Sequence, residues 1–530
     1  MQEIDSKALR SKLTSTDEIA LIDVREEGVF SKEHIFLGSC IPASHLEFRA
    51  EPLMSRKSVP VIITDGGDQD DGLAERAAVR LAEMGYKDVS VLAGGVAGWR
   101  DSGFEVFSGV NVPSKAFGEL VEHYYETPRI PAADLNALKE AGENVVILDS
   151  RPMDEFNRMS IPDGVDCPGA ELVYRVGMMA PDPTTMVVVN CAGRTRSIIG
   201  AQSLINAGIP NKVMALKDGT MGWELQGFTC ARDETKHAPQ PEGEVLKTAM
   251  TRAGAVATRF GVKRASADQV ESWLRESQRT TFLLDVRTDE EFVAGHWQGA
   301  HHAPGGQLVQ ATDEYVGVRN ARIVLADTAD GVRATMTASW LVQLGYQDVH
   351  VLTDQPGTPE IGSAATAPAL FKLFASATSA ELQAARASGV PIQIIDLADS
   401  LTFRKGHIPG ALWGVRSRIS QWAASLKDAG TVFITSPDGR LAHYAAHELA
   451  ATRPELAIRV LEGGTQAWKA RSQPIETGIE NTLTEIDDVW WKPYESQGRV
   501  RQAMEDYLTW EVGLVEQVQR DGLVDFRKFD

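Results

Sequence analysis

A single cysteine stands where a strand-like run of residues meets a helix-like run. Residues 186–190 are rich in strand-forming side chains, and a helical pattern begins near residue 197. A thiol at the start of a helix lies among backbone N–H groups at the positive end of the helix dipole, where nearby arginines add positive charge. We therefore predict a thiolate nucleophile with an anion site beside it. The segment concerned is Cys191, Ala192, Gly193, Arg194, Thr195, Arg196 and Ser197.

A packing role is the simpler interpretation of Cys191, because free cysteines are often buried at strand ends. It does not explain Arg194 and Arg196, since a buried apolar thiol has no use for two adjacent cations. Arg151 follows another strand-like run and is a further candidate for the same pocket. An ion pair with a nearby carboxylate, such as that of Asp149 or Glu155, explains Arg151 equally well.

The composition is that of a soluble globular protein with several domains. The chain has 530 residues, 43% hydrophobic and 24% charged, and this length predicts about three to five domains. A net charge of -20 disfavours nucleic acid and anionic membranes as partners, so any anion site must be local. We find no long apolar span and no secretory character at the start of the sequence.

The cysteines do not form a disulfide framework, because only four occur in so long a chain. Cys40 and Cys167 are interpreted as packing residues, and Cys230 as a less favoured candidate to resolve a persulfide. No Cys/His spacing predicts a zinc site, and His301-His302 has no suitably spaced partners. We expect no metal and no cofactor, and a reducing cytoplasm as the compartment.

One sequence pattern recurs four times along the chain. Each copy contains a buried-looking strand that ends in aspartate, at Asp23, Asp149, Asp285 and Asp396. A Gly-x-x-x-Trp pattern closes three of the copies, at residues 95–99, 219–223 and 464–468. Capping-box pairs, Ser266 with Gln269 and Thr378 with Glu381, mark helix starts near the beginning of two units. Alternating strand-like and helical runs predict parallel sheets with crossover helices, an α/β fold.

These marks together resemble the rhodanese (thiosulfate sulfurtransferase) family. They are the Asp-x-Arg strand end, the Gly-His-Ile-Pro-Gly-Ala turn at 406–411, the cysteine loop and the terminal Gly-Gly-x-x-x-Trp. The resemblance implies four tandem rhodanese-like domains, each a parallel sheet flanked by helices, as in bacterial multi-rhodanese sulfurtransferases with an aromatic tail. The second unit departs from the pattern, because Arg158-Met159-Ser160 stands where other units have Gly-His. We place the domains at 1–108, 128–231, 262–360 and 376–478, followed by a mostly helical tail at 479–530.

Only the second unit carries cysteine at the reactive position. The corresponding residues are Asp65 in the first unit, Asp327 in the third and Ser436 in the fourth. An aspartate cannot accept a sulfane sulfur and repels an oxyanion, and no base is identifiable beside Ser436. We therefore expect three inactive domains and one active domain.

The resemblance implies a double displacement at Cys191. The thiolate takes the outer sulfur of thiosulfate or glutathione persulfide, and the resulting persulfide passes that sulfur to cyanide or a thiol. Arg194 and Arg196, with Arg151 as a further candidate, orient the oxygens of the donor. The loop from Ala192 through Gly193 and Thr195 to Ser197 supplies N–H groups that stabilise the sulfur anions. We expect no general base in the first step.

Other functions remain open at this point. One is a persulfide carrier or scaffold whose degenerate domains bind partners, and another is a redox sensor. A phosphatase is disfavoured, because related phosphatases have a loop one residue longer than the one from Cys191 to Arg196. The aromatic tail is interpreted as an arm packed on its own protein, with a homodimer contact as the alternative.

Overall fold

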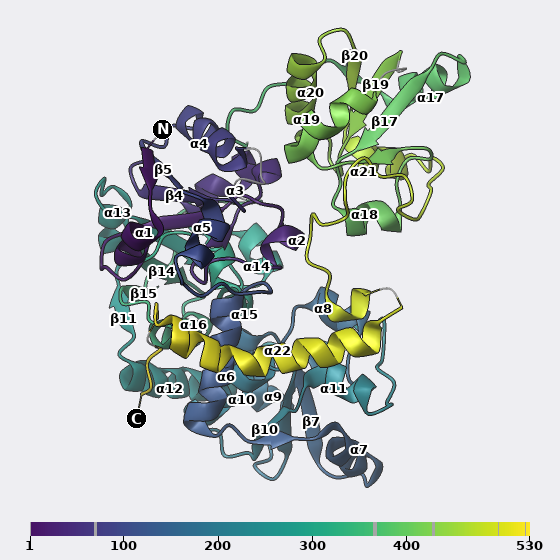
Figure 1. The fold of residues 1–530 in the computed structure, drawn as a ribbon. Coiled ribbons are helices and arrows are strands. Elements are labelled where there is room, and N and C mark those ends of the chain that lie inside the picture. The colour runs from purple at the N-terminus through teal and green to yellow at the C-terminus, as the bar shows by residue number, and fades with distance from the viewer. Residues whose placement is uncertain are drawn as a thin grey trace.

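The computed structural model describes residues 2–67, 72–363, 368–426, 430–496, 498–524 and 526–529. Its strands form four sheets of five parallel strands, which confirms the predicted α/β fold of four tandem units (Figure 1). Every sheet has the same order: the first strand of the unit lies at one edge, followed by the fifth, fourth, second and third.

The strands alternate with helices along each unit. In the first unit they are β1 (Gln2–Ile4), β2 (Ala20–Asp23), β3 (Ser39–Cys40), β4 (Pro60–Thr64) and β5 (Asp88–Leu92). The second has β6 (Arg129–Ile130), β7 (Val145–Asp149), β8 (Val165–Asp166), β9 (Met186–Asn190) and β10 (Val213–Leu216). The third has β11 (Lys263–Ala265), β12 (Thr281–Asp285), β13 (His301–His302), β14 (Arg322–Ala326) and β15 (Val349–Leu352). The fourth has β16 (Ser376–Ala377), β17 (Ile392–Asp396), β18 (Leu412–Trp413), β19 (Thr431–Thr435) and β20 (Ala457–Leu461).

Helices cover the sheets and join the units. The first unit carries α1 (Ser6–Leu13), α2 (Glu27–Phe30), α3 (Leu46–Leu53), α4 (Leu73–Glu83) and α5 (Gly95–Asp101). The second carries α7 (Ala132–Glu140), α8 (Met153–Arg158), α9 (Leu172–Met179), α10 (Thr195–Asn206) and α11 (Gly219–Leu225). The third carries α13 (Ala267–Leu274), α14 (Asp289–Ala294), α15 (Gly305–Gln310) and α16 (Val332–Gln343). The fourth carries α17 (Ser379–Ala387), α18 (Ser400–Lys405), α19 (Ile419–Trp422), α20 (Arg440–Thr452) and α21 (Gly464–Ala470). The connectors are α6 (Val112–Tyr125) and α12 (Gly243–Phe260), and the tail ends in α22 (Val500–Asp521).

The strand that leads to Cys191 is β9, which lies between β10 and β7 in its sheet. Its central valines, 187–189, are fully buried, as expected for a parallel strand covered on both faces. Both predicted capping boxes are present, at the starts of α13 and α17. The cysteine loop therefore begins at the carboxyl edge of a rigid central strand, where α/β proteins commonly bind ligands.

The tail packs against its own chain, as predicted. It leaves the fourth domain, passes the end of α8 and continues as α22, which runs along α6 (Figure 1). Leu514, Val518 and Phe526 are buried in the same core cluster as Phe117 of α6. None of the helices in the described part of the chain combines the length and apolar character needed to cross a membrane.

Candidate active site

Cys191 lies in the turn between β9 and α10, and its side chain points toward the first turn of the helix. The residue is only 2% exposed. The Ser197 hydroxyl donates a hydrogen bond to Cys191 Sγ over 3.0 Å, and the backbone N–H of Ser197 also contributes a hydrogen bond to this thiol. The structure thus places Ser197 directly on the predicted nucleophile.

The prediction that Cys191 rests as a thiolate is wrong for this closed site. Burial raises the pKa of the Cys191 thiol above its usual value, and this effect outweighs the opposing influence of Arg196, the Ser197 hydrogen bonds and Arg151. The proton on Cys191 must therefore leave before the sulfur can attack. Sequence reasoning missed this because it did not foresee how deeply the tail and neighbouring domains bury the loop.

Arg196 is the cation that faces the site. Its guanidinium lines a cavity beside Cys191 and exerts the largest charge effect on the thiol. It binds Glu155 of α8 through two hydrogen bonds of 3.0 and 2.8 Å and contacts Gln307 Oε1 at 3.2 Å. Arg196 in turn holds the pKa of Glu155 down to about 2. The pair fixes a guanidinium at the wall of the cavity.

Arg194 is paired with carboxylates and is not among the residues that line the cavity, and its role in orienting the donor stays a prediction. Its Nε and Nη2 atoms bind the two carboxylate oxygens of Glu119 at 2.7 Å each. Nη2 also binds Glu122 at 2.6 Å, and Nη1 binds Asp218 at 3.1 Å. Arg194 is 6% exposed, and these carboxylates occupy its guanidinium. It joins the cysteine loop to α6.

Arg151 forms the ion pair that its sequence position allowed, and its role in substrate binding stays a prediction. Its Nε and Nη2 atoms bind Asp149 at 2.8 and 2.7 Å, and the side chain is 1% exposed. The same Asp-x-Arg pair occurs in the first and third domains, as Asp23 with Arg25 and Asp285 with Arg287. Because domains without cysteine share this pair, it stabilises the fold. Arg151 also has a lowering influence on the pKa of Cys191.

The remaining loop residues are held by contacts on both sides. Ala192 lines the cavity, and its carbonyl oxygen accepts a hydrogen bond from the N–H of Met221 at 3.0 Å. Thr195 donates to Glu511 of α22 at 3.3 Å. A side chain at Gly193 would meet Glu511 Oε2 at 3.2 Å and the Tyr507 ring at 3.3 Å. The glycine therefore lets α22 approach the loop closely.

In the domains without cysteine, a side-chain oxygen atom takes the position that Cys191 Sγ has in the second domain. Asp65 accepts the N–H of Ala74 at 3.0 Å, and Asp327 accepts that of Ala334 at 2.9 Å. Ser436 accepts the N–H of Ala442 at 3.3 Å. Each donor lies in the first turn of the following helix, as Ser197 does in the second domain. In the two aspartate loops a fixed carboxylate therefore occupies the anion position.

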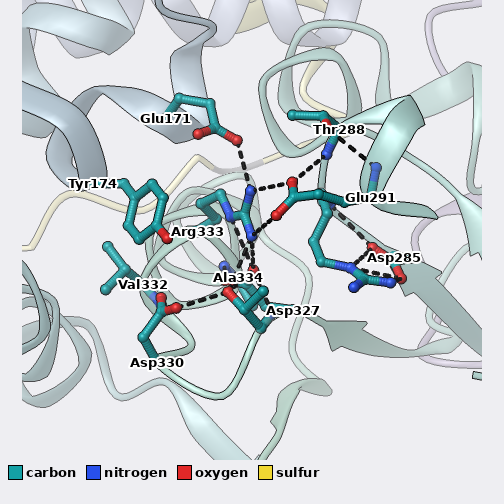
Figure 2. A network of polar contacts seen from close by, with 12 residues as sticks. Glu171, Tyr174, Asp285, Thr288, Glu291, Asp327, Asp330, Val332, Arg333 and Ala334 are labelled. Atoms are coloured by element: carbon teal, nitrogen blue, oxygen red, sulfur yellow. Dashed lines mark hydrogen bonds and ion pairs between the residues drawn. The ribbon is translucent and has the colours of Figure 1, made fainter. Parts of the chain in front are cut away.

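The loop of the third domain has become an interdomain contact. Figure 2 shows Arg333 between Asp327, Glu291 and Glu171, the last contributed by the second domain. The Arg333 side chain is fully buried. Burial raises the pKa of Asp327 to about 6, against the pull of this arginine. A loop that lacks cysteine thus helps to fix the second domain to the third.

A cavity of ≈ 430 Å³ opens beside the cysteine loop, and all four domains and the tail contribute to its wall. This volume lies within the usual range for organic ligands and is larger than thiosulfate requires. Its lining includes Glu27 and Lys115 from the first domain and connector, Ala192 and Arg196 from the second, and Gln307 and Tyr315 from the third; Thr402 and Lys405 come from the fourth, and Trp490, Lys492 and Tyr507 from the tail.

Three residues beside the loop were missed by sequence reasoning. Glu511 is 1% exposed, accepts a hydrogen bond from the Tyr507 hydroxyl at 2.9 Å, and has a pKa raised to about 7, chiefly by burial. Lys115 is also buried and has a pKa lowered to about 8 for the same reason. One signal was available: Glu511 falls in the buried stripe of α22 with Met504, Leu514 and Val518. A carboxylate in an apolar stripe indicates a special environment.

Cys167 and Cys230 lie in apolar surroundings. Cys167 is fully buried and Cys230 is 6% exposed, each within a hydrophobic cluster. Burial raises the pKa of Cys230 to about 12. Within the described residues, no group of three or more His, Cys, Asp or Glu side chains is arranged to hold a metal ion.

Comparisons with known proteins agree with this geometry. The family model described as "Rhodanese-like domain" matches residues 6–102, 131–226, 266–354 and 378–471. The crystal structure of thiosulfate sulfurtransferase from Pseudomonas aeruginosa is 43% identical, with a TM-score of 0.95 and 100% of both chains covered. A rhodanese-related protein from Thermoplasma volcanium is 18% identical with a TM-score of 0.18, covering 19% of this chain and 98% of its own. No curated protein matches the sequence.

Proposed function

The chain belongs to the rhodanese-like family, and on that premise we propose that it transfers sulfane sulfur from thiosulfate or glutathione persulfide to a small acceptor through a persulfide on Cys191. The observation that carries the proposal is that Cys191, which accepts a hydrogen bond from Ser197, lies in the loop whose Ala192 and Arg196 line one cavity. Full-length similarity to a thiosulfate sulfurtransferase supports it. The cysteine usage favours a reducing compartment such as the cytoplasm.

The first half-reaction begins when Cys191 loses its proton and its sulfur attacks the outer sulfur of the donor. The S–S bond of thiosulfate breaks, its electron pair leaves with sulfite, and Cys191 keeps the transferred sulfur. Arg196 stands at the cavity wall, where its positive charge attracts the donor's oxygens. The hydroxyl and N–H of Ser197 stabilise negative charge on Cys191 Sγ.

The enclosure of the site favours a small acceptor over a protein partner. Cys191 is 2% exposed, and its cavity is walled by four domains and the tail. A persulfide carrier must present its sulfur to a second protein, which this arrangement would allow only after domains separate. A tripeptide thiol is within the size range that a cavity of ≈ 430 Å³ accommodates, so we propose cyanide and low-molecular-weight thiols as acceptors.

A steady-state assay with thiosulfate and cyanide, repeated with glutathione persulfide as donor, tests this function. Cys191→Ser is expected to abolish turnover, whereas Cys230→Ser is the matched control, because Cys230 is also buried but lies in a separate apolar cluster. Mass spectrometry should find one added sulfur on Cys191 after treatment with donor alone. Turnover that survives in Cys191→Ser would refute the assignment, and a stable persulfide without turnover would favour the carrier.

A further inference from the structure

Glu511 is a buried acid with no role in the sulfur transfer proposed above. It lies on the C-terminal helix α22 and is 1% exposed. One carboxylate oxygen, Oε1, accepts hydrogen bonds from Tyr507 at 2.9 Å and Thr195 at 3.3 Å. The other, Oε2, is buried and has no hydrogen-bond partner among the described residues. It lies against Gly193, where an added side chain would meet it at 3.2 Å.

Tyr507 connects this acid to the reaction cavity. Its side chain lines the same cavity as Arg196 and Ala192, and its hydroxyl contacts Glu511. The charges of Cys191 and Arg196 both act on this hydroxyl, which places it near the reactive sulfur. A path for a proton therefore runs from the cavity through the Tyr507 hydroxyl to Glu511.

Burial and the charges around Glu511 bring its pKa to about 7. Burial and the neighbouring carboxylate of Glu119 raise its pKa to about 7, against the opposing influence of Lys115, Arg194 and the Tyr507 hydrogen bond. Lys115 is itself buried, and its ammonium lies over the rings of Trp490, Tyr507 and Trp510 at 5.2, 5.8 and 5.4 Å. The groups that face Glu511 are thus Lys115 and Glu119 from α6, Arg194 and Thr195 from the start of α10, and Tyr507 from its own helix.

On the basis of the proposed sulfur transfer, we propose that Glu511 and Tyr507 form the proton shuttle of the active site, supplied by the C-terminal helix. The transfer to a thiol acceptor requires such a group, because the acceptor R–SH must lose a proton before its sulfur attacks. The Cys191 persulfide is a better electrophile when its outer sulfur carries a proton. A single group that accepts the proton of the acceptor thiol and donates a proton to the persulfide meets both requirements.

The steps balance over one cycle. Cys191 first gives its proton to the ionised Glu511 through Tyr507, and its thiolate displaces sulfite from thiosulfate to become Cys191–S–S⁻. This persulfide takes the proton back from Glu511 to give Cys191–S–SH, and the acceptor R–SH then gives its own proton to Glu511 by the same path. The R–S⁻ electron pair bonds to the outer sulfur, the S–S bond to Cys191 breaks, and its electron pair stays on Cys191 Sγ, which regains a proton from Glu511. The product is R–S–SH, and both Cys191 and Glu511 return to their starting forms.

The cyanide ion makes a sharp comparison, because it carries no proton to remove; its rate constants are expressed per concentration of the ion, since HCN, the main form at neutral pH, carries a proton as a thiol does. For a thiol acceptor, loss of a general acid–base group is expected to lower kcat/KM about 10²-fold or more. Glu511→Gln should therefore slow transfer to a thiol by a much larger factor than transfer to cyanide. The wild-type kcat/KM for the thiol should rise through an apparent pKa near 7, matching Glu511, and this limb should disappear in Glu511→Gln.

The experiment measures Glu511→Gln, Tyr507→Phe and the control Glu516→Gln with thiosulfate and either a thiol or cyanide, across pH. Glu516 is an exposed acid on the same helix, so its variant should match the wild type. Amide for carboxylate keeps an oxygen acceptor for Tyr507 and Thr195, and Tm measurements report any loosening of α22. An unchanged pH profile and an equal loss with both acceptors would overturn the shuttle while leaving the sulfurtransferase intact. Wild-type protein that forms no Cys191 persulfide would instead overturn the proposed function.

Discussion

Replacing Arg194 distinguishes a structural arginine from a substrate-binding one. In Arg194→Met the carboxylates of Glu119 and Glu122 lose their shared cation, although their side chains are only 4% and 15% exposed. Removing one partner of a buried ion pair destabilises a protein by about 3–5 kcal/mol. For a domain of this size that corresponds to a fall in Tm of roughly 10 °C or more. Because the guanidinium of Arg194 is already paired with carboxylates, the KM for thiosulfate should change little at temperatures where the variant is folded.

The assay is thermal unfolding of the wild type, Arg194→Met, Glu119→Gln, the double variant and the control Arg129→Met, together with steady-state sulfur transfer. Glu119→Gln in the Arg194→Met background removes one uncompensated charge and should recover part of the lost stability, about 1–3 kcal/mol of coupling. Arg129→Met is the matched control, because Arg129 pairs with Glu122 at 2.8 Å but is 41% exposed. Its loss should cost less than about 1 kcal/mol.

The stability lost in Arg194→Met should depend on pH in a direction that follows from the pKa of Glu119. Burial already raises the pKa of Glu119 above its usual value, and Arg194 opposes that rise. Without Arg194 the folded-state pKa rises further, so the folded protein binds a proton that the unfolded chain releases at a lower pH. The destabilisation should therefore shrink as pH falls toward 5 and grow as pH rises through the folded-state pKa. An Arg194→Met protein with wild-type Tm and a many-fold higher KM for thiosulfate would refute the reasoning.

Two further changes test the cysteine loop. Ser197→Ala removes the hydroxyl that lies 3.0 Å from Cys191 Sγ, so the pKa of Cys191 should rise further and its alkylation by iodoacetamide should shift to higher pH; an unshifted profile would show that this bond does not stabilise the thiolate. Asp327→Cys places a thiol in the third domain, where Arg333 still pairs with Glu171 and Glu291. The matching N–H in this loop comes from Ala334, so the new thiol has no counterpart of the Ser197 hydroxyl. We expect no turnover from Cys191→Ser/Asp327→Cys in the thiosulfate–cyanide assay, and measurable activity would show that the cysteine alone limits that domain.

Local patterns in the sequence were sufficient to predict the fourfold fold and the place of the cysteine loop between a strand and a helix. The recurring Asp-x-Arg strand ends and Gly-x-x-x-Trp segments indicate repeated units, because each mark belongs to one strand end or one short helix. Cys191 was identifiable for the same reason: its strand and its helix adjoin it in the chain. The register of β7 with β9, which pairs Asp149 with Asn190, then brings the two strand ends together.

The roles of the charged residues could not be predicted, because their partners are remote in sequence. Arg194 and Arg196 are two positions apart, yet one binds Glu119 on a connector helix and the other faces a cavity formed by four domains. The resting state of Cys191 depends in the same way on burial by segments hundreds of residues away. Glu511 lies 320 positions beyond Cys191, and only its place in an apolar stripe marked it in the sequence.

The repeated loop also explains how three domains without cysteine contribute to one reaction. In every domain, the side chain at the cysteine position accepts an N–H from the first helical turn. An aspartate there places an internal carboxylate in the loop, and in the third domain that loop joins neighbouring domains through Arg333. In the proposed reaction only the cysteine accepts sulfur. The three domains without cysteine would then act through position: they contribute to the wall of the cavity beside Cys191, so we expect the size of the acceptor to depend on domains that carry no cysteine at this position.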